Sequence, residues 1–178
     1  DGRMDPKCFE HVLTENEREK FQRDGFLMVE NAIPQEFVDN LIPIVDRIDR
    51  AERLRLGHAP GARVNHYDFI GKDDLFLELM DWHTTLPKVW GIMGWHIQLY
   101  HTHMTHTPPE GSGKSLEKDG LDLGWHQDSG QLNPDLETTP RPMVSLKVAY
   151  FLTDTTVLGR GNFYVVPGSQ LRNDFPGE

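Results

Sequence analysis

The sequence has little of what marks a secreted or membrane-bound protein. It contains one cysteine, Cys8, so no internal disulfide can form, and no basic stretch followed by an apolar stretch opens the chain. The densest apolar run, residues 89–95, is far shorter than the roughly 20 residues that a transmembrane helix needs. We therefore expect a cytoplasmic protein without a membrane partner.

Positive charge is also scarce. The 178 residues include 18 Lys and Arg against 28 Asp and Glu, which gives a net charge of −10 at pH 7, and the basic residues form no stripe. Because a phosphate backbone is bound mainly through Lys and Arg, we expect no nucleic-acid partner. The length is that of one domain, so we expect a single domain over residues 1–178 that binds a small molecule. The sequence predicts no particular oligomeric state.

The first 94 residues carry mainly helical signals. Thr14 and Glu17 have the spacing of a capping box, which predicts a short helix over 18–24 that Gly25 ends. A strand is expected over 25–29, and Pro34 then opens a second helix. The apolar residues of this second helix recur at three- and four-residue spacing, as Phe37, Leu41, Ile44, Val45 and Ile48. A third helical pattern runs over 73–91, with Leu75, Leu79 and Trp82 on one side.

From residue 95 to 178 the pattern becomes that of strands. Ile97, Leu99, His101 and His103 alternate with polar or aromatic residues, and a polar loop is expected over 107–120. Further strands are predicted over 123–127, 143–152 and 162–166. Helices first and strands afterwards predict an α+β fold, in which the N-terminal helices brace a strand-built barrel or sandwich.

The most informative short motif is the pair His126 and Asp128. Residues two apart on a strand project from the same face, so an imidazole and a carboxylate can reach one point. Together with a second histidine from elsewhere they would form the facial triad that binds Fe(II) and leaves coordination positions open. Taken alone, a His-x-Asp triplet is a weak signal, because most copies are solvated surface pairs.

The wider pattern resembles the phytanoyl-CoA dioxygenase family of Fe(II)- and 2-oxoglutarate-dependent oxygenases. Trp-His-x-Asp at residues 125–128 is followed by Leu-x-Asp at 152–154 and by a glycine-led segment that closes on Pro-Gly-Ser at 167–169. The resemblance implies a double-stranded β-helix, or jelly roll, with Fe(II), 2-oxoglutarate and O2 as cofactors. It implies that His126 and Asp128 are the catalytic metal ligands. The implied reaction oxidises a C–H bond of a small-molecule substrate and releases succinate and CO2.

The sequence departs from the family pattern in one respect. No histidine follows His126, whereas the distal iron ligand of the family, and the arginine that binds 2-oxoglutarate, come after the Pro-Gly-Ser segment. We expect the C-terminal strands of the jelly roll to be missing from this sequence. A catalytically inactive jelly-roll binding module is the alternative.

Three further residues are candidates for the site. By the resemblance, His103 faces the iron and the co-substrate, although a histidine bound to backbone is the simpler interpretation. Lys147 lies in the middle of an apolar strand, where an inward ammonium would pair with a carboxylate of the co-substrate and an outward one would be solvated. Gln127 is a candidate for substrate contact. A rival enzyme hypothesis is a cupin-type metal site built from His101, His103 and His126.

Overall fold

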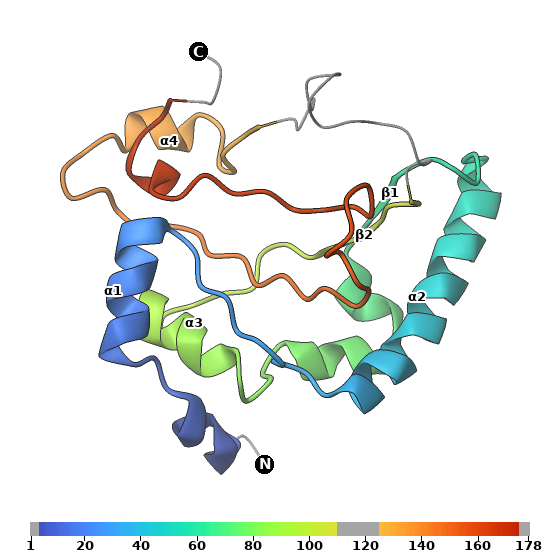
Figure 1. The fold of residues 1–178 in the computed structure, drawn as a ribbon, viewed down its shortest axis with the longest axis horizontal. Coiled ribbons are helices and arrows are strands. Elements are labelled where there is room, and N and C mark those ends of the chain that lie inside the picture. The colour runs from blue at the N-terminus through green and yellow to red at the C-terminus, as the bar shows by residue number, and fades with distance from the viewer. Residues whose placement is uncertain (1–3, 110–124, 175–178) are drawn as a thin grey trace.

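A computed structural model describes residues 4–109 and 125–174 of the chain and has an α+β fold. In chain order the labelled elements are α1 (Glu15–Asp24), α2 (Gln35–Leu56), β1 (Val64–Tyr67), α3 (Leu86–Met93), β2 (His103–His106) and α4 (Leu132–Asp135). Short 3-10 helices cover Pro6–His11, Phe69–Lys72, Asp74–Leu79 and Ser169–Leu171. The helices lie around the rim of the molecule, and extended segments of the later chain cross the space between α1 and α2 (Figure 1).

Helix α1 ends where the sequence predicts, but it begins at Glu15 and not at residue 18, because Thr14 is its N-cap. The Thr14 hydroxyl accepts a hydrogen bond from the backbone N–H of Glu17, and the Glu17 carboxylate accepts one from the backbone N–H of Thr14. Gly25 ends the helix at φ 82°, a conformation that glycine adopts without strain. The Gln170 side-chain amide donates to the carbonyl of Gln22 at 2.9 Å, and a Cβ atom at residue 25 would collide with this amide. The end of α1 is thereby joined to the turn at 168–171.

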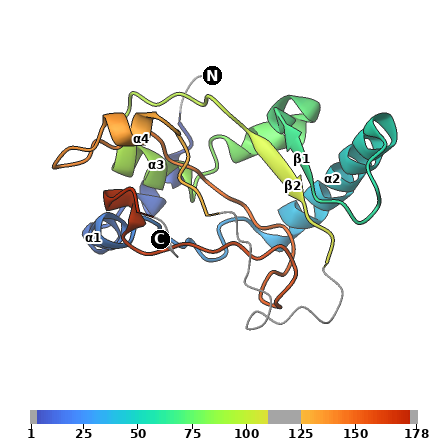
Figure 2. The same cartoon turned by 90° about the horizontal axis from the view of Figure 1, so that it is seen from above.

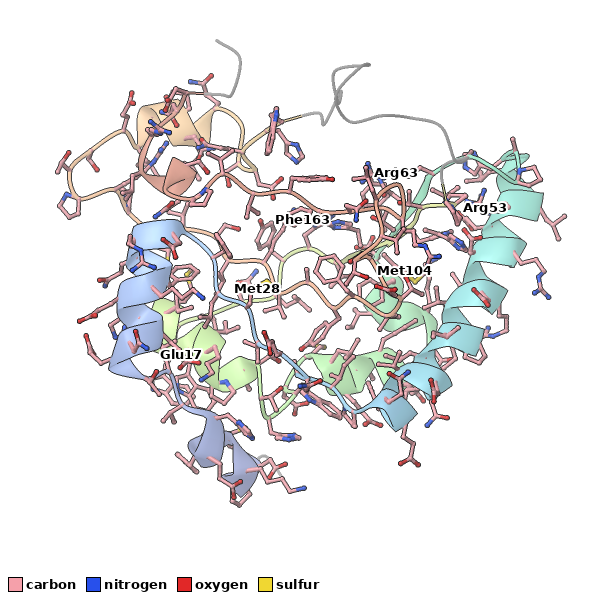
Figure 3. All side chains as sticks on the ribbon, viewed as in Figure 1. Glu17, Met28, Arg53, Arg63, Met104 and Phe163 are labelled. Carbon is pink, nitrogen blue, oxygen red and sulfur yellow. The ribbon has the colours of Figure 1, made fainter. Side chains whose placement is uncertain are left out.

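Helix α2 supplies most of the hydrophobic core. It begins after Pro34, as predicted, and buries Phe37, Leu41 and Ile48 against Phe76. The partly buried residues around this cluster are Ile33, Ile44, Val45, Phe69, Ile70, Leu75, Leu79, Trp82, Met104 and Leu152. Met104 joins from β2, on the inner side of α2 (Figure 3). The apolar stripe of α2 is therefore the surface on which the chain packs.

The helical pattern over residues 73–91 forms two helices instead of one. A 3-10 helix ends at Leu79 and α3 begins at Leu86. Pro87 lacks a backbone N–H and cannot donate an intrahelical hydrogen bond, so it is tolerated in the first turn of a new helix and not inside a longer one. The predicted inward side is nevertheless confirmed, because Leu75, Leu79 and Trp82 pack on the core.

The described residues form one sheet, of two antiparallel strands. Strand β1 pairs with β2 in a register that places Val64 opposite His106 and Tyr67 opposite His103. The strand predicted from residue 95 onward begins only at His103, and β1 was not predicted. The other expected strands, over 25–29, 143–152, 162–166 and the described part of 123–127, are wrong as strands: these segments run without ladder partners. From residue 110 on, the loop expected over 107–120 lies outside the described residues.

A buried polar cluster fixes the β1–β2 sheet to α2. The Asp49 carboxylate accepts hydrogen bonds from Arg53 Nε at 2.7 Å and from His66 Nε2 at 2.9 Å. His106 Nδ1 lies 3.0 Å from Oδ2 of Asp49, the oxygen that Arg53 also contacts. His66 comes from β1 and His106 from β2, while Arg53 also donates to the carbonyls of residues 59 and 62. Figure 2 shows α2 and the sheet at the same end of the molecule, with α1 and α4 at the other.

A membrane-spanning helix was not found in the parts of the chain that the structure describes, residues 4–109 and 125–174.

Candidate functional site

The His126–Asp128 segment leads into the short helix α4. Residues 125–127 have no regular secondary structure, and Asp128 opens a turn in which Ser129 has φ 78° and Gly130 has φ 42°. Two successive residues in the left-handed region reverse the chain sharply, so Asp128 stands at a bend between this segment and a helix.

The structure brings the side chains of His126 and Asp128 together. Nε2 of His126 lies 3.7 Å from Oδ1 of Asp128, and the two side chains are 74% and 44% exposed. The imidazole and the carboxylate are thus neighbours at an open surface that solvent or a ligand reaches. Their assignment as metal ligands stays a prediction.

Lys147 reaches the same carboxylate from the segment 143–152. Its Nζ lies 2.5 Å from Oδ2 of Asp128, so the ammonium points toward the His126–Asp128 pair. Desolvation alone would raise the pKa of Asp128, but the hydrogen bond and the positive charge of Lys147 outweigh it and hold that pKa below its ordinary value. Asp128 is therefore ionised at neutral pH, which is the form that binds a cation.

His103, at the start of β2, belongs to the same electrostatic neighbourhood. Its pKa is lowered, chiefly by desolvation of the ring and then by the positive charges of Lys147 and His101, while Asp128 acts in the opposite direction. The rings of His101 and His103 have centroids 5.2 Å apart. At neutral pH His103 is a neutral imidazole facing a cationic and an anionic side chain.

An open cavity of about 410 Å³ adjoins this cluster. Its lining consists of Tyr100, His101, Asp128, Ser129, Leu132, Val144, Ser145 and Lys147. Our sequence interpretation did not single out Tyr100 and Ser145, whose hydroxyls lie 2.9 Å apart. Ser145 stands two residues before Lys147, so the period of two along an extended segment is the signal that would have found it.

Gln127 points to a different part of the chain. Its Nε2 donates to the backbone carbonyls of Ser169, at 2.8 Å, and Arg172, at 2.6 Å. The side chain thereby holds the 126–128 segment to the turn that follows Pro167. Contact of Gln127 with substrate stays a prediction.

A complete set of metal ligands is not gathered around the pair. Among the residues that the structure describes, no group of three or more His, Cys, Asp or Glu side chains is placed to hold a metal ion. His126 and Asp128 accordingly provide two neighbouring donors.

Comparison with known proteins identifies the relationship that the motifs suggest. A family model for phytanoyl-CoA dioxygenase (PhyH) matches residues 21–178. The chain belongs to the phytanoyl-CoA dioxygenase family. No curated protein and no solved structure matches the chain. The phytanoyl-CoA dioxygenase family comprises Fe(II)- and 2-oxoglutarate-dependent oxygenases, and the match spans all three of the motifs at 125–128, 152–154 and 167–169.

Proposed function

We propose that this member of the phytanoyl-CoA dioxygenase family is an Fe(II)- and 2-oxoglutarate-dependent dioxygenase that oxidises a C–H bond of a small-molecule substrate. The scaffold proposed for it is the jelly roll that membership of the family implies. The observation that carries the proposal is the 3.7 Å approach of His126 and Asp128 beside a cavity that Asp128 lines.

The two donor atoms suit one metal ion. Two ligand atoms that are each about 2.1 Å from a metal can be no more than about 4.2 Å apart. The separation of 3.7 Å lies within that limit, and an imidazole with a carboxylate is the donor chemistry that non-haem Fe(II) sites use. With iron bound, O2 would be the oxidant: one of its oxygen atoms would enter the succinate that forms, with CO2, from 2-oxoglutarate, and the other would oxidise the substrate.

Lys147 and His103 are the proposed co-substrate contacts. 2-Oxoglutarate is a dianion, and in a chain with net charge −10 the exposed ammonium of Lys147 provides local positive charge at the edge of the cavity. A neutral His103 ring can donate one N–H to an oxygen of the co-substrate without competing with Lys147 for charge. Binding of the co-substrate would require Lys147 to exchange part of its contact with Asp128 for the incoming carboxylate.

The substrate is proposed to occupy the cavity of about 410 Å³. Leu132 and Val144 give it apolar surface, while the hydroxyls of Tyr100 and Ser145 offer hydrogen bonds. A volume of this size suits a small organic molecule. The cupin-type hypothesis with His101, His103 and His126 has less support, because no three-donor group that includes them occurs in the described parts of the chain.

A second candidate function is that of a binding module without turnover. The ion pair of 2.5 Å between Lys147 and Asp128 favours it, because an ammonium at that distance already neutralises the carboxylate that a metal would need. This module would bind an anionic metabolite at Lys147 and His103.

Anaerobic titration with Fe(II), followed by assay of succinate release with 2-oxoglutarate and O2, separates the two functions. The dioxygenase binds Fe(II) and forms succinate, and both properties are lost in His126→Ala and Asp128→Ala. The matched controls His58→Ala and Asp46→Ala remove an exposed histidine and an exposed carboxylate elsewhere and should retain both. Binding of 2-oxoglutarate without Fe(II) binding or succinate would favour the module, and unaltered Fe(II) binding in Asp128→Ala would exclude the proposed site.

A further inference from the structure

The bend that carries Asp128 is held from outside its own backbone. Ser129 adopts φ 78°, which is unfavourable for a residue with a Cβ atom, and Gly130 follows at φ 42°. Within the turn, the backbone N–H of Leu132 donates to the carbonyl of Ser129 at 2.9 Å, and that of Asn133 donates to the carbonyl of Gly130 at 3.2 Å. These two bonds close the turn but leave the carbonyl of Asp128 to another donor.

Asn133 is that donor. Its side-chain Nδ2 donates to the backbone carbonyl of Asp128 at 2.6 Å, across five residues of chain. The bond spans the left-handed residues and fixes the peptide group directly attached to the Cα of Asp128. Because the direction of a side chain follows its own backbone, the Asn133 amide also constrains where the Asp128 carboxylate points.

Asn133 is in turn held by residues far along the chain. Arg141 Nη2 donates to the Asn133 carbonyl at 2.8 Å and also binds Oδ1 of Asn173. The Asn173 amide donates to the same Asn133 carbonyl at 3.4 Å. The short helix α4 is thus tied to residues 172–174 instead of standing alone.

A second link joins the other side of the metal-ligand segment to the same region. Gln127, between His126 and Asp128, donates to the carbonyls of Ser169 and Arg172. We call Gln127, Asn133, Arg141 and Asn173 the polar frame. Its hydrogen bonds form a closed circuit that passes through residues 127 and 128 on one side and residues 169–173 on the other.

We propose that Asn133 is a positioning residue for the Asp128 carboxylate, and that the polar frame sets the geometry of the metal-binding pair. The inference rests on the proposed function, since it takes Asp128 as a metal ligand. Outer contacts of this kind orient the ligands of metal sites and tune their affinity. In this chain Lys147 contacts the Asp128 carboxylate directly, and the Asn133 amide holds the backbone that carries it, beside two backbone hydrogen bonds that close the turn.

The test uses Co(II) as a stable, coloured probe for the Fe(II) site. Removal of an outer contact typically weakens metal binding by about 10-fold or more. Asn133→Ala is therefore expected to raise the Co(II) dissociation constant about tenfold and to change the visible spectrum of bound Co(II), which reports ligand geometry. Asn173→Ala, which keeps the donor to Asp128 and removes its support, should show a smaller change in the same direction.

Asn162→Ala is the matched control. Asn162 also donates from a side-chain amide to a backbone carbonyl, that of Val157 at 3.2 Å, in a turn that does not contain the metal-binding pair. We expect it to lower thermal stability and to leave Co(II) affinity and spectrum unchanged. This separates a geometric effect on the site from a general loss of stability.

The possible outcomes distinguish the two proposals. If Asp128→Ala abolishes Co(II) binding while folded Asn133→Ala retains the wild-type dissociation constant and spectrum, the inference is overturned and the proposed function stands. If Asn133→Ala does not fold, Asn173→Ala decides in the same way. Absence of Co(II) binding by the wild-type protein, or unchanged binding in Asp128→Ala, would overturn both.

Discussion

Two parts of the chain differ in how well their side chains are buried: the helical part up to residue 94 and the extended part from residue 95 onward. Every residue that is buried in the described structure lies before position 95, and most of these residues are in α2, β1 and the segments that pack on α2. After that point large apolar residues stay exposed, among them Tyr100 at 65% and Phe163 at 72%. Phe163 lies on the later, extended part of the chain (Figure 3). A helix satisfies its backbone hydrogen bonds within itself, whereas an extended segment needs a neighbour for every bond.

The same contrast explains how the candidate site is held. Asp128 and Lys147 are themselves outside the buried cluster, although Leu152 anchors the segment of Lys147 on it, and their contacts are an ion pair and hydrogen bonds. The candidate site is therefore held together mainly by polar contacts, whereas the helical part is held together by apolar packing. Substitutions in the two regions are expected to separate stability from binding.

The largest expected effect is on the helical core. Leu41 is completely buried in α2, and Leu41→Ala should lower the free energy of unfolding by about 2–5 kcal/mol, because it removes apolar contacts and leaves a cavity. Phe163→Ala, in the extended part, should change it by less than about 0.5 kcal/mol. Urea unfolding monitored by circular dichroism measures both. Equal losses in the two variants would contradict the comparison.

A smaller effect is expected from acid on the same region. Desolvation would raise the pKa of Asp49, but the hydrogen bonds from Arg53 and His66 outweigh it and hold that pKa below its ordinary value. A lowered pKa in the folded state stabilises the protein above the unfolded-state pKa of about 3.9, and this stability is lost as the pH falls through the folded-state pKa.

Measurement of the unfolding free energy between pH 7 and pH 2 tests the contribution of Asp49. The wild-type protein should lose stability below about pH 4 more steeply than Asp49→Asn, which cannot titrate at that position. Parallel curves for the two proteins would show that Asp49 makes no contribution to acid unfolding.

A small effect on stability, but a clear one on function, is expected at Lys147. Its ion pair with Asp128 is half-exposed, so Lys147→Met should change stability by less than about 1 kcal/mol. Loss of the ammonium should raise the KM for 2-oxoglutarate about tenfold, with a smaller change in kcat. Lys88→Met, which breaks the Lys88–Glu17 ion pair of the helical part, is the control and should leave this KM unchanged. An unaltered KM in Lys147→Met would exclude the co-substrate contact.

Local signals in the sequence predicted local structure. Thr14, Gly25 and Pro34 act within one helical turn: Gly25 ends α1 and Pro34 precedes α2 as predicted, while the end of α2 at Leu56 was not predicted. The apolar spacing of α2 also identified its buried side. The strands could not be placed in the same way, because alternation indicates an extended chain but does not specify its partner, as residues 143–152 illustrate.

In the candidate site, too, contacts between neighbours in sequence could be predicted and contacts between distant segments could not. His126 and Asp128 are neighbours in space because they are only two residues apart in the chain, and Lys147 was singled out as a charge within an apolar segment. The contacts of Gln127 and Asn133 could not be predicted, because they depend on residues 169–173 and on a turn whose left-handed residues include a serine. No local pattern encodes a hydrogen bond between segments more than 40 residues apart.

The contact between Gly25 and Gln170 places a constraint on how this protein can evolve. The glycine leaves room for a long amide that reaches the last carbonyls of α1, and the left-handed backbone at position 25 tolerates no other residue easily. A substitution at position 25 would need a shorter side chain at 170, and that shorter side chain would no longer cover the end of the helix. Among homologues, these two positions should change together or not at all.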